Sequence, residues 1–326
     1  MMVGQAEPFS VALGWGRLSG LLHGRISGLM PISGPISGPI SGPIPGSTQG
    51  RAEDIPVLAL HGWLDNAASF LPLMALSERR WLALELAGHG HSDHRGAGNF
   101  GPFWDHVADL LETLDQLQLT RVDLLGHSMG GAVAVVFAAA FPERVRSLVL
   151  LESLGPLTHS EERFVSEIRR ATLERLAFKD RRRFYPSLEL PIAARAQRKD
   201  IDPASAELLM RRGCEELEPG VRFRTDPRHL LPSATRGTEG QMLTAIRALQ
   251  CPTLAVLATP RTSYLDGPAM AARRAAWPQF NEVLVPGGHH VHMDSPALVL
   301  PELAGFWQRI ALAKPAEHVL RERTPG

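Results

Sequence analysis

Short runs of apolar residues, separated by longer stretches with a helical pattern, recur along the chain from Ile55 onward. The runs fall at residues 56–60, 81–86, 122–125, 147–151, 253–258 and 282–285. Strands of this length that alternate with helices are typical of a parallel sheet with crossover connections. The pattern therefore predicts an α/β fold in which helices flank a mostly parallel central sheet.

Helical spacing is clearest in two of the stretches between these runs. In the first, the apolar positions that repeat at helical intervals are Val107, Leu110, Leu111, Leu114 and Leu117. They predict one amphipathic helix. The second stretch, residues 129–141, is rich in glycine and alanine, so we expect a helix that packs closely on the sheet.

The chain before the first apolar run predicts a hairpin, with strands at residues 9–13 and 17–23. Residues 27–46 then repeat the tetrad Ile-Ser-Gly-Pro, and this much proline and glycine excludes a helix or a continuous strand. We interpret residues 27–48 as a low-complexity loop insertion, because lengthening a loop costs a folded core little.

The alternation of strands and helices stops after Leu154 and resumes at Cys251. The stretch between them is rich in arginine and glutamate and has helical patterns at residues 161–176 and 204–217. A helical cap inserted into an α/β core would have this pattern. We therefore expect a core in two parts, residues 1–155 and 241–326, with a helical cap at residues 156–240.

Charge and cysteine content narrow the expected partners and location. The 34 basic residues balance the 34 acidic ones, which favours neither nucleic acid nor a membrane as partner. The N-terminus lacks the pattern of a secretory signal, and no apolar run reaches the ~18 residues of a membrane span, so we expect a cytoplasmic protein. Cys214 and Cys251 fit neither a disulfide framework nor a zinc site and are expected to be reduced thiols.

Candidate chemistry centres on Ser128. The apolar run at 122–125 leads into Gly126-His127-Ser128-Met129-Gly130 and then into a predicted helix. This order is typical of a nucleophile elbow, a turn so tight that a side chain at 126 or 130 would collide with its neighbours. We predict that Ser128 is a nucleophile at the start of a helix, whose N–H groups favour negative charge, and that Gly126 and Gly130 permit the turn.

A serine hydroxyl needs a base to become a good nucleophile. His289, His290 and His292 follow the last apolar run, and the glycines before His289 would let a loop deliver its ring into a crowded site. A second histidine group lies at His89, His91 and His94. Such groups can also bind a metal. We expect no metal here, because no carboxylate and histidine pair falls at a helical ligand spacing and the serine elbow already explains the site.

Several motifs, in order, resemble the α/β-hydrolase superfamily and, within it, the branch of serine hydrolase-like proteins. They are LHGWLDNAASF at 60–70, LAGHGHSDHR at 86–95, the elbow, and GHHVHMD at 288–294. The resemblance covers roughly residues 55–312 and implies the α/β-hydrolase fold. It also implies that His289 is the catalytic histidine and that the backbone N–H groups of Trp63 and Met129 form the oxyanion hole.

The third member of a triad is where the sequence departs from the commonest superfamily pattern. That pattern places an aspartate just after the strand predicted at 253–258, where this chain has Arg261. Asp266 would serve only if the loop is longer. Glu152 ends the strand that follows the nucleophile along the chain, and some branches of the superfamily resemble this in placing the acid there. We favour Glu152, with Asp266 as the alternative acid.

These residues predict a serine hydrolase that cleaves carboxylic esters or related acyl bonds of a small molecule, without a cofactor. The same triad would also serve lactone, amide or carbon–carbon bond hydrolysis, or perhydrolysis. A non-catalytic binding protein of the same fold is a further alternative, favoured if Glu152 points away from His289. The sequence makes no prediction about oligomeric state.

Overall fold

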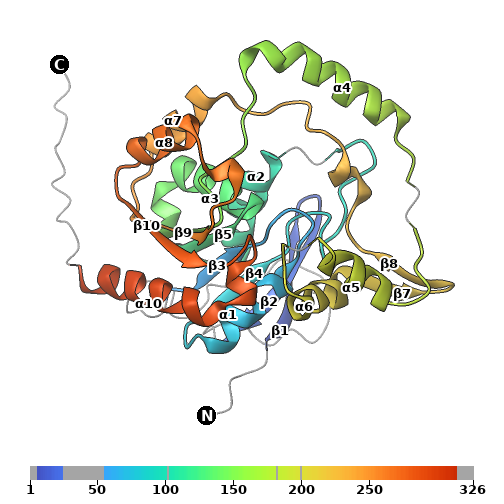
Figure 1. Cartoon of the computed structure of the whole chain (residues 1–326), viewed down its shortest axis with the longest axis horizontal. Coiled ribbons are helices and arrows are strands. Elements are labelled where there is room, and N and C mark those ends of the chain that lie inside the picture. Colours follow the sequence, from blue (N-terminus) through green and yellow to red (C-terminus); the bar gives the residue numbers. More distant parts are fainter. Residues whose placement is uncertain (1–5, 25–54, 101–102, 181–182, 199, 314–326) are drawn as a thin grey trace.

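The computed structural model of the protein describes residues 6–24, 55–100, 103–180, 183–198 and 200–313. The predicted loop insertion at 27–48 lies outside these residues. In the described part, an eight-stranded sheet has the order β1-β2-β4-β3-β5-β6-β9-β10 (Figure 1). Its strands are β1 (Glu7–Leu13), β2 (Gly16–His23), β3 (Val57–Leu60), β4 (Trp81–Leu84), β5 (Val122–His127), β6 (Val145–Leu151), β9 (Thr253–Thr259) and β10 (Phe280–Pro286).

The six strands from β4 to β10 in this order run parallel, and the β1–β2 hairpin joins their edge in antiparallel fashion. Every apolar run that predicted a parallel strand forms one, with ends shifted by a few residues. The predicted hairpin is also present. The expectation of a mostly parallel α/β sheet is therefore confirmed.

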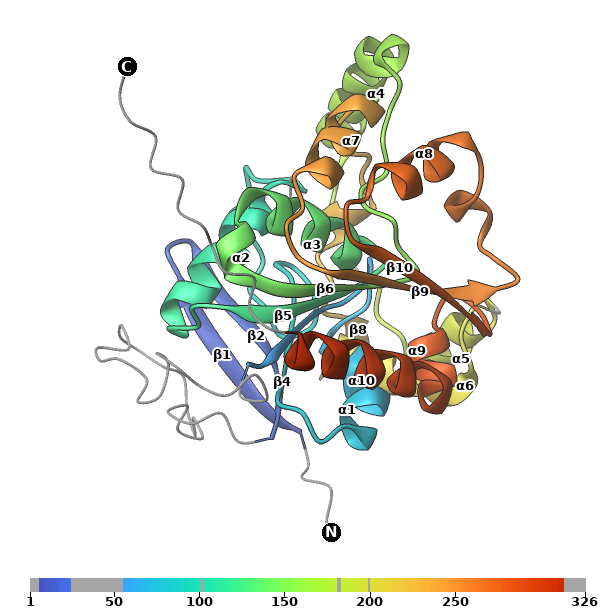
Figure 2. The ribbon, with the colours of Figure 1, turned by 90° about the vertical axis from the view of Figure 1, so that its left-hand side faces the viewer.

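Helices cover both faces of the sheet (Figure 2). One face carries α2 (Asp105–Gln116), α3 (Met129–Ala140), α7 (Glu239–Arg247) and α8 (Pro268–Ala276), and the other carries α1 (Leu71–Leu76), α9 (Val291–Asp294) and α10 (Pro296–Leu312). Strands β3 and β4 are buried at every position because both of their faces are covered. Burial on both sides explains why these strands are continuously apolar in sequence.

The segment between β6 and α7 leaves the sheet, as Figure 1 shows. It contains α4 (Phe164–Ala177), α5 (Glu189–Ala196), α6 (Pro203–Gly213) and an antiparallel pair, β7 (Cys214–Leu217) and β8 (Gly220–Phe223). The helix expected at 204–217 was predicted too long: it ends at Gly213, and the next residues pair with β8. Short 3-10 turns lie at Ala67–Phe70, Pro142–Arg144, Glu161–Arg163, Pro227–Leu230 and Ser263–Leu265.

We refer to residues 156–238 as the cap. A buried ion pair joins the cap to the core: Arg212 of α6 donates from Nε to Glu85 Oε1 at 2.6 Å, and Glu85, just after β4, is fully buried. Arg228 reaches the core as well, since its guanidinium donates to the carbonyl oxygens of Arg95 and Asn99. Within the described part of the chain, no helix has the length and apolar character needed to cross a membrane.

Candidate active site

Ser128 stands in the sharp turn between β5 and α3. Its backbone is in a region that favours glycine, with φ 49° and ψ −113°. The turn is closed by the Ser128 N–H, which donates to the carbonyl of Leu151 at the end of β6 (2.9 Å). This strained backbone holds the serine at the carboxyl edge of the sheet, as an elbow requires.

The two flanking glycines are sterically required. A Cβ on Gly126 would lie 2.4 Å from the carbonyl oxygen of Gly130, and a Cβ on Gly130 would lie 2.1 Å from the carbonyl oxygen of Leu60. Because both obstacles are backbone atoms, no side-chain rotation could relieve these contacts. The glycines singled out from the sequence therefore sit where any larger residue would open the turn.

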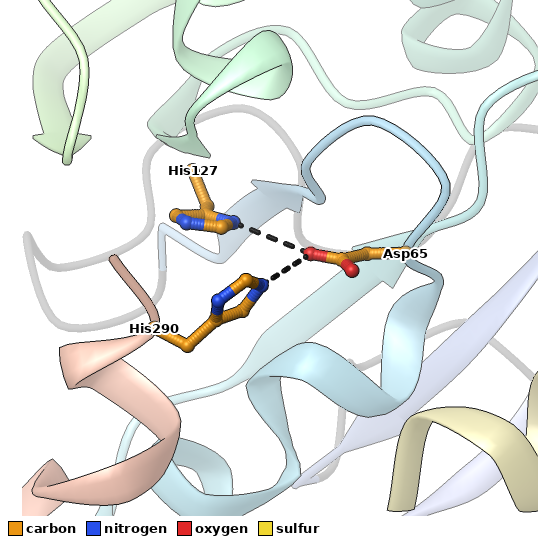
Figure 3. Close-up of side chains that lie close together, drawn as sticks. All are labelled: Asp65, His127 and His290. Atoms are coloured by element: carbon orange, nitrogen blue, oxygen red, sulfur yellow. Dashed lines mark hydrogen bonds and ion pairs between the residues drawn. The ribbon is translucent and has the colours of Figure 1, made fainter. Parts of the chain in front are cut away.

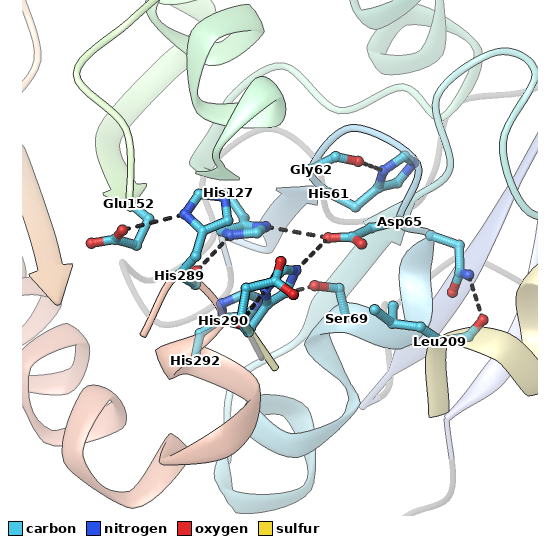
Figure 4. A network of polar contacts seen from close by, with 12 residues as sticks. His61, Gly62, Asp65, Ser69, His127, Glu152, Leu209, His289, His290 and His292 are labelled. Atoms are coloured by element: carbon cyan, nitrogen blue, oxygen red, sulfur yellow. Dashed lines mark hydrogen bonds and ion pairs between the residues drawn. The ribbon is translucent and has the colours of Figure 1, made fainter. Parts of the chain in front are cut away.

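Glu152 and His289 meet at the edge of the sheet (Figure 4), and both line a cavity together with Ser128. His289 Nδ1 lies 3.3 Å from Glu152 Oε2, so the ring can donate its Nδ1 hydrogen to the carboxylate. This leaves Nε2, the opposite nitrogen, as the acceptor on the imidazole. Ser128 and His289 line the same two cavities, so the histidine, its carboxylate and the serine occupy one site.

Glu152 is buried and tightly held. Its Oε1 accepts from the backbone N–H of Ala258 (2.5 Å), and Oε2 accepts from the hydroxyl of Thr262. Burial alone would raise the pKa of Glu152, but the hydrogen bonds from His289, Ala258 and Thr262 bring this pKa below its ordinary value. The carboxylate is therefore ionised at neutral pH and can stabilise a positively charged His289.

Tyr264 completes the surroundings of His289 and was not anticipated from the sequence. Its hydroxyl donates to the backbone carbonyl of Glu152 (3.0 Å) and lies 3.2 Å from His289 Nδ1. Since that hydroxyl has one hydrogen, the Nδ1 hydrogen of His289 is shared between two acceptors, Glu152 and Tyr264. The only signal was the position of Tyr264 in the loop after β9, where the superfamily pattern expects the acid.

Asp266, the alternative acid, is not near His289 in the structure. Its side chain is half exposed and lies 3.6 Å from Arg261 Nη1. Arg261 in turn pairs with Glu282 of β10. The loop after β9 therefore sends Thr262 and Tyr264 toward the histidine and turns Asp266 toward solvent.

The predicted oxyanion donors come from two separate segments of the chain. Met129 is the first residue of α3, where backbone N–H groups have no partner within the helix. Trp63 lies in the loop after β3, and its indole N–H donates to the carbonyl of His229 (3.0 Å). His61 fixes this loop, because its Nδ1 donates to the Gly62 carbonyl (2.7 Å) while its Nε2 accepts from the Leu86 N–H (3.0 Å).

A further group of buried polar side chains adjoins the site and was not predicted as a group. Asp65 Oδ2 lies 3.5 Å from His127 Nδ1 and 3.2 Å from His290 Nε2 (Figure 4). Burial lowers the pKa of His127 to about 4, so this ring is neutral. The histidine groups recognisable in the sequence each lie within a single loop, whereas this group combines one residue from each of three distant segments.

Two cavities meet at Ser128. The α5 cavity, about 560 Å³, extends toward α5 and β8 and includes Arg183, Tyr185, Arg195, Arg198 and Phe223. The α4 cavity, about 610 Å³, extends toward α4 and includes Trp104, Leu157, Arg175, Leu231 and Tyr264. Trp63, Ser128 and His289 line both. A molecule bound across the serine would therefore extend one arm into each cavity.

The sheet, the elbow and the inserted segment define a hydrolase-type α/β protein. Residues 55–296 match the family model described as the alpha/beta hydrolase fold, and the chain belongs to this family. Its similarity to a zebrafish (Danio rerio) protein named serine hydrolase-like protein is 31% identity over 271 residues, which cover 79% of this chain and 83% of that one. The resemblance to the serine hydrolase-like branch is thereby confirmed.

Two other proteins extend the comparison. A hypothetical protein of Pseudomonas aeruginosa, known from its crystal structure, has 35% sequence identity and a TM-score of 0.79, covering 93% of this chain and all (100%) of that one. A 2-(acetamidomethylene)succinate hydrolase of Mesorhizobium japonicum is 28% identical over 254 residues, 77% of this chain and 87% of that protein. The relatives are thus matched over most of their length.

Proposed function

We propose that the protein is a serine hydrolase that cleaves carboxylic esters, or related acyl bonds, of a small molecule through an acyl-enzyme. Ser128 is the nucleophile, His289 the general base and Glu152 the acid that orients it. The observation that carries the proposal is the contact between His289 Nδ1 and the buried carboxylate of Glu152, at 3.3 Å, beside a serine in an elbow. A binding protein would have no need to keep this ionised, fully buried carboxylate against a histidine.

In the proposed reaction, His289 Nε2 takes the hydroxyl proton of Ser128 as Oγ attacks the carbonyl carbon. The carbonyl oxygen becomes negatively charged and accepts hydrogen bonds from the backbone N–H groups of Trp63 and Met129. Collapse of this intermediate breaks the bond to the leaving group, which takes the proton from His289. Water then attacks the acyl-enzyme by the same steps, releasing the acid and restoring the serine hydroxyl.

The α5 cavity favours a substrate that carries a carboxylate. Arg195 pairs with Asp200 (2.6 Å), but among the residues that the structure describes, Arg183 and Arg198 have no carboxylate partner. The cavity also contains Asp65, Asp200 and Asp226, which pair with His290, Arg195 and Arg228, respectively. An anionic arm would therefore compensate the two remaining positive charges. The Mesorhizobium relative is named for the hydrolysis of a substituted succinate, a compound of this kind. The α4 cavity, with Trp104, Leu157 and Leu231, suits a more apolar arm.

A fluorophosphonate probe tests the nucleophile, because it reacts with activated serines. The wild-type protein should be labelled, Ser128→Ala should not, and Ser153→Ala, a change at a cavity-lining serine, should still be labelled. An unlabelled wild-type protein would favour the binding-protein alternative. A panel of acyl esters, lactones and amides, with and without a carboxylate, would then rank the remaining reactions by kcat/KM.

A further inference from the structure

Asp65, His127 and His290 form a compact buried group that takes no part in the proposed acyl-transfer steps. They come from the loop after β3, the end of β5 and the residue before α9, respectively (Figure 3). Their exposed fractions are 4%, 0% and 3%. One side-chain nitrogen or oxygen from each lies within 4.8 Å of the other two.

The outer hydrogen bonds of the two rings determine which nitrogen faces the group. His127 Nε2 lies 3.0 Å from the carbonyl oxygen of His289, and His290 Nδ1 lies 3.0 Å from that of Asp200. A carbonyl can only accept, so each of these outer nitrogens carries a hydrogen. Histidines that donate the outer N–H to a backbone carbonyl and turn the inner nitrogen inward are typical metal ligands.

The inner nitrogen of His127, Nδ1, is buried without a hydrogen-bond partner among the described residues. With a hydrogen on Nε2, the neutral ring has a bare lone pair at this fully buried atom. It nevertheless points at a carboxylate oxygen of Asp65, 3.5 Å away. A lone pair that faces a carboxylate in the interior is electrostatically unfavourable, and a cation between the two atoms would reverse the sign of the interaction.

Gly62 packs directly against these atoms. A Cβ placed on Gly62 would lie 2.8 Å from His127 Nδ1 and 3.0 Å from Asp65 Oδ2. Glycine at this position therefore avoids a clash with both prospective ligand atoms. All three residues of the group also line the α5 cavity, from which a water molecule could reach them.

In contrast to the expectation from the sequence that the chain binds no metal, we propose that Asp65, His127 and His290 bind a divalent transition-metal ion, for which Zn²⁺ is the best match. Two imidazole nitrogens and one carboxylate oxygen are ligands that zinc favours, with water as the fourth. Tetrahedral zinc separates its ligand atoms by about 3.4 Å. The two contacts of Asp65 Oδ2, at 3.5 and 3.2 Å, are close to this value.

Arg195 is the group that opposes the ion. Its Nη2 lies 3.2 Å from His290 Nε2, so it must withdraw from this nitrogen when the ion binds. Both terminal nitrogens of Arg195 donate to Asp200, Nη1 at 2.6 Å and Nη2 at 3.3 Å, so this ion pair can hold the guanidinium when it turns away from His290. The bound ion would connect the oxyanion loop, the elbow and the histidine loop, the segments that supply Trp63, Ser128 and His289.

Equilibrium dialysis of the chelator-treated, full-length protein against Zn²⁺ tests the proposal without reference to activity. We expect one ion per chain, a Kd of about 1 µM or tighter, and a melting temperature raised by about 5 °C at saturating Zn²⁺. Asp65→Asn and His290→Gln should each weaken binding more than about 100-fold. His106→Asn is the matched control, because His106 and Asp109 form a buried pair (3.7 Å) to which the described residues add no third ligand.

The proposal is overturned if the wild-type protein binds no Zn²⁺ at 1 µM to 100 µM, roughly the range that three such ligands would reach. It is equally overturned if Asp65→Asn and His290→Gln bind as tightly as His106→Asn. Circular dichroism verifies that the variants fold. Should either fail to fold, Co²⁺ bound to the wild-type protein decides: intense visible d–d bands indicate the expected four-coordinate nitrogen and oxygen site, and weak octahedral bands contradict it.

Discussion

Glu152 Oε2 and His289 Nδ1 lie 3.3 Å apart although 137 positions separate the two residues in the chain. The contact arises because β6 and β10 are parallel and both end at the carboxyl edge of the sheet. The residues that follow these strands, Glu152 and the loop with His289, therefore lie at the same edge. Glu152 also has a positive φ of 50°, a backbone conformation that residues other than glycine rarely adopt. The contact between the two side chains thus depends on the backbone positions of both Glu152 and His289.

Replacing the carboxylate of Glu152 by an amide should lower catalytic activity far more than the same replacement at Asp266. We expect Glu152→Gln to lower kcat by about 10³- to 10⁴-fold, since the amide cannot stabilise the positively charged His289. Asp266→Asn, its matched control, should retain nearly normal kcat. Both are measured on one ester. Loss of activity in Asp266→Asn with a normal Glu152→Gln would assign the acid to the loop after β9.

The unpaired arginines of the α5 cavity predict a specificity effect. Arg198→Ala should lower kcat/KM for a carboxylate-bearing ester about fivefold and leave that for the matching neutral ester unchanged, because only the anion gains from the charge. Arg211→Ala, which removes an exposed cap arginine paired with Glu207, is the control. Equal losses on both esters would mean that Arg198 supports the cap rather than recognises charge.

Asp109 lies outside the candidate active site, and its lowered pKa predicts that the stability of the folded protein depends on pH. Burial alone would raise its pKa, but His106, Arg95 and the indole of Trp15 bring it below the ordinary value of 3.8. The folded state therefore gains stability from the ionised carboxylate above pH ~4, and this gain is lost as pH falls through the lowered pKa. Asp109→Asn should cost about 3 kcal/mol at pH 7, since it removes the nearer carboxylate of Arg95 and leaves that arginine only the longer contact with Asp105 (3.8 Å).

Urea unfolding at several pH values measures this effect. The difference in the free energy of unfolding between the wild-type protein and Asp109→Asn should be largest at neutral pH and should shrink below pH ~4. A difference that stays constant from pH 7 to pH 3, or that grows on acidification, would contradict the assignment.

The cysteines predict a lack of thiol reactivity. Burial raises the pKa of Cys214 to about 11 and that of Cys251 to about 12. At pH 8 only about one thiol in a thousand or fewer is then ionised, and the thiolate is the reactive form. A chromogenic disulfide reagent should react slowly with the folded protein and rapidly with both thiols in guanidinium. Rapid reaction of either thiol in the folded protein would show that its surroundings are open.

The sequence predicted those parts of the fold and site that depend on local sterics or on burial. The elbow could be predicted from Gly126 and Gly130, since backbone atoms leave no room for a side chain at these positions. The strands could be predicted from their continuous apolar runs, since both of their faces are covered. Glu152 was predicted from its position at the end of a buried strand. For the elbow and the strands, one segment of sequence contained the physical reason, whereas Glu152 also required the comparison with Arg261 in a later loop and the resemblance to the superfamily.

Other features depend on contacts between distant segments and could not be predicted. The helix of the cap ends at Gly213 because the next residues pair with β8, which only the folded chain brings alongside. Tyr264 reaches His289 through a loop conformation that its sequence does not specify. The inward nitrogens of His127 and His290 are set by carbonyls of other loops, so no spacing within one motif could reveal them.

The two cavities at Ser128 have walls from different parts of the cap. The α5 cavity takes its outer wall from α5, α6 and β8, and the α4 cavity takes its outer wall from α4 and residues 231–237. These wall segments are separate in sequence, while Trp63, Ser128, His289 and the cap residue Leu230 are common to both cavities. A mutation in one wall can therefore alter the fit of one end of a substrate and leave the other end and the reacting groups unchanged. Selection can thus adjust preference at the two ends of a substrate one at a time.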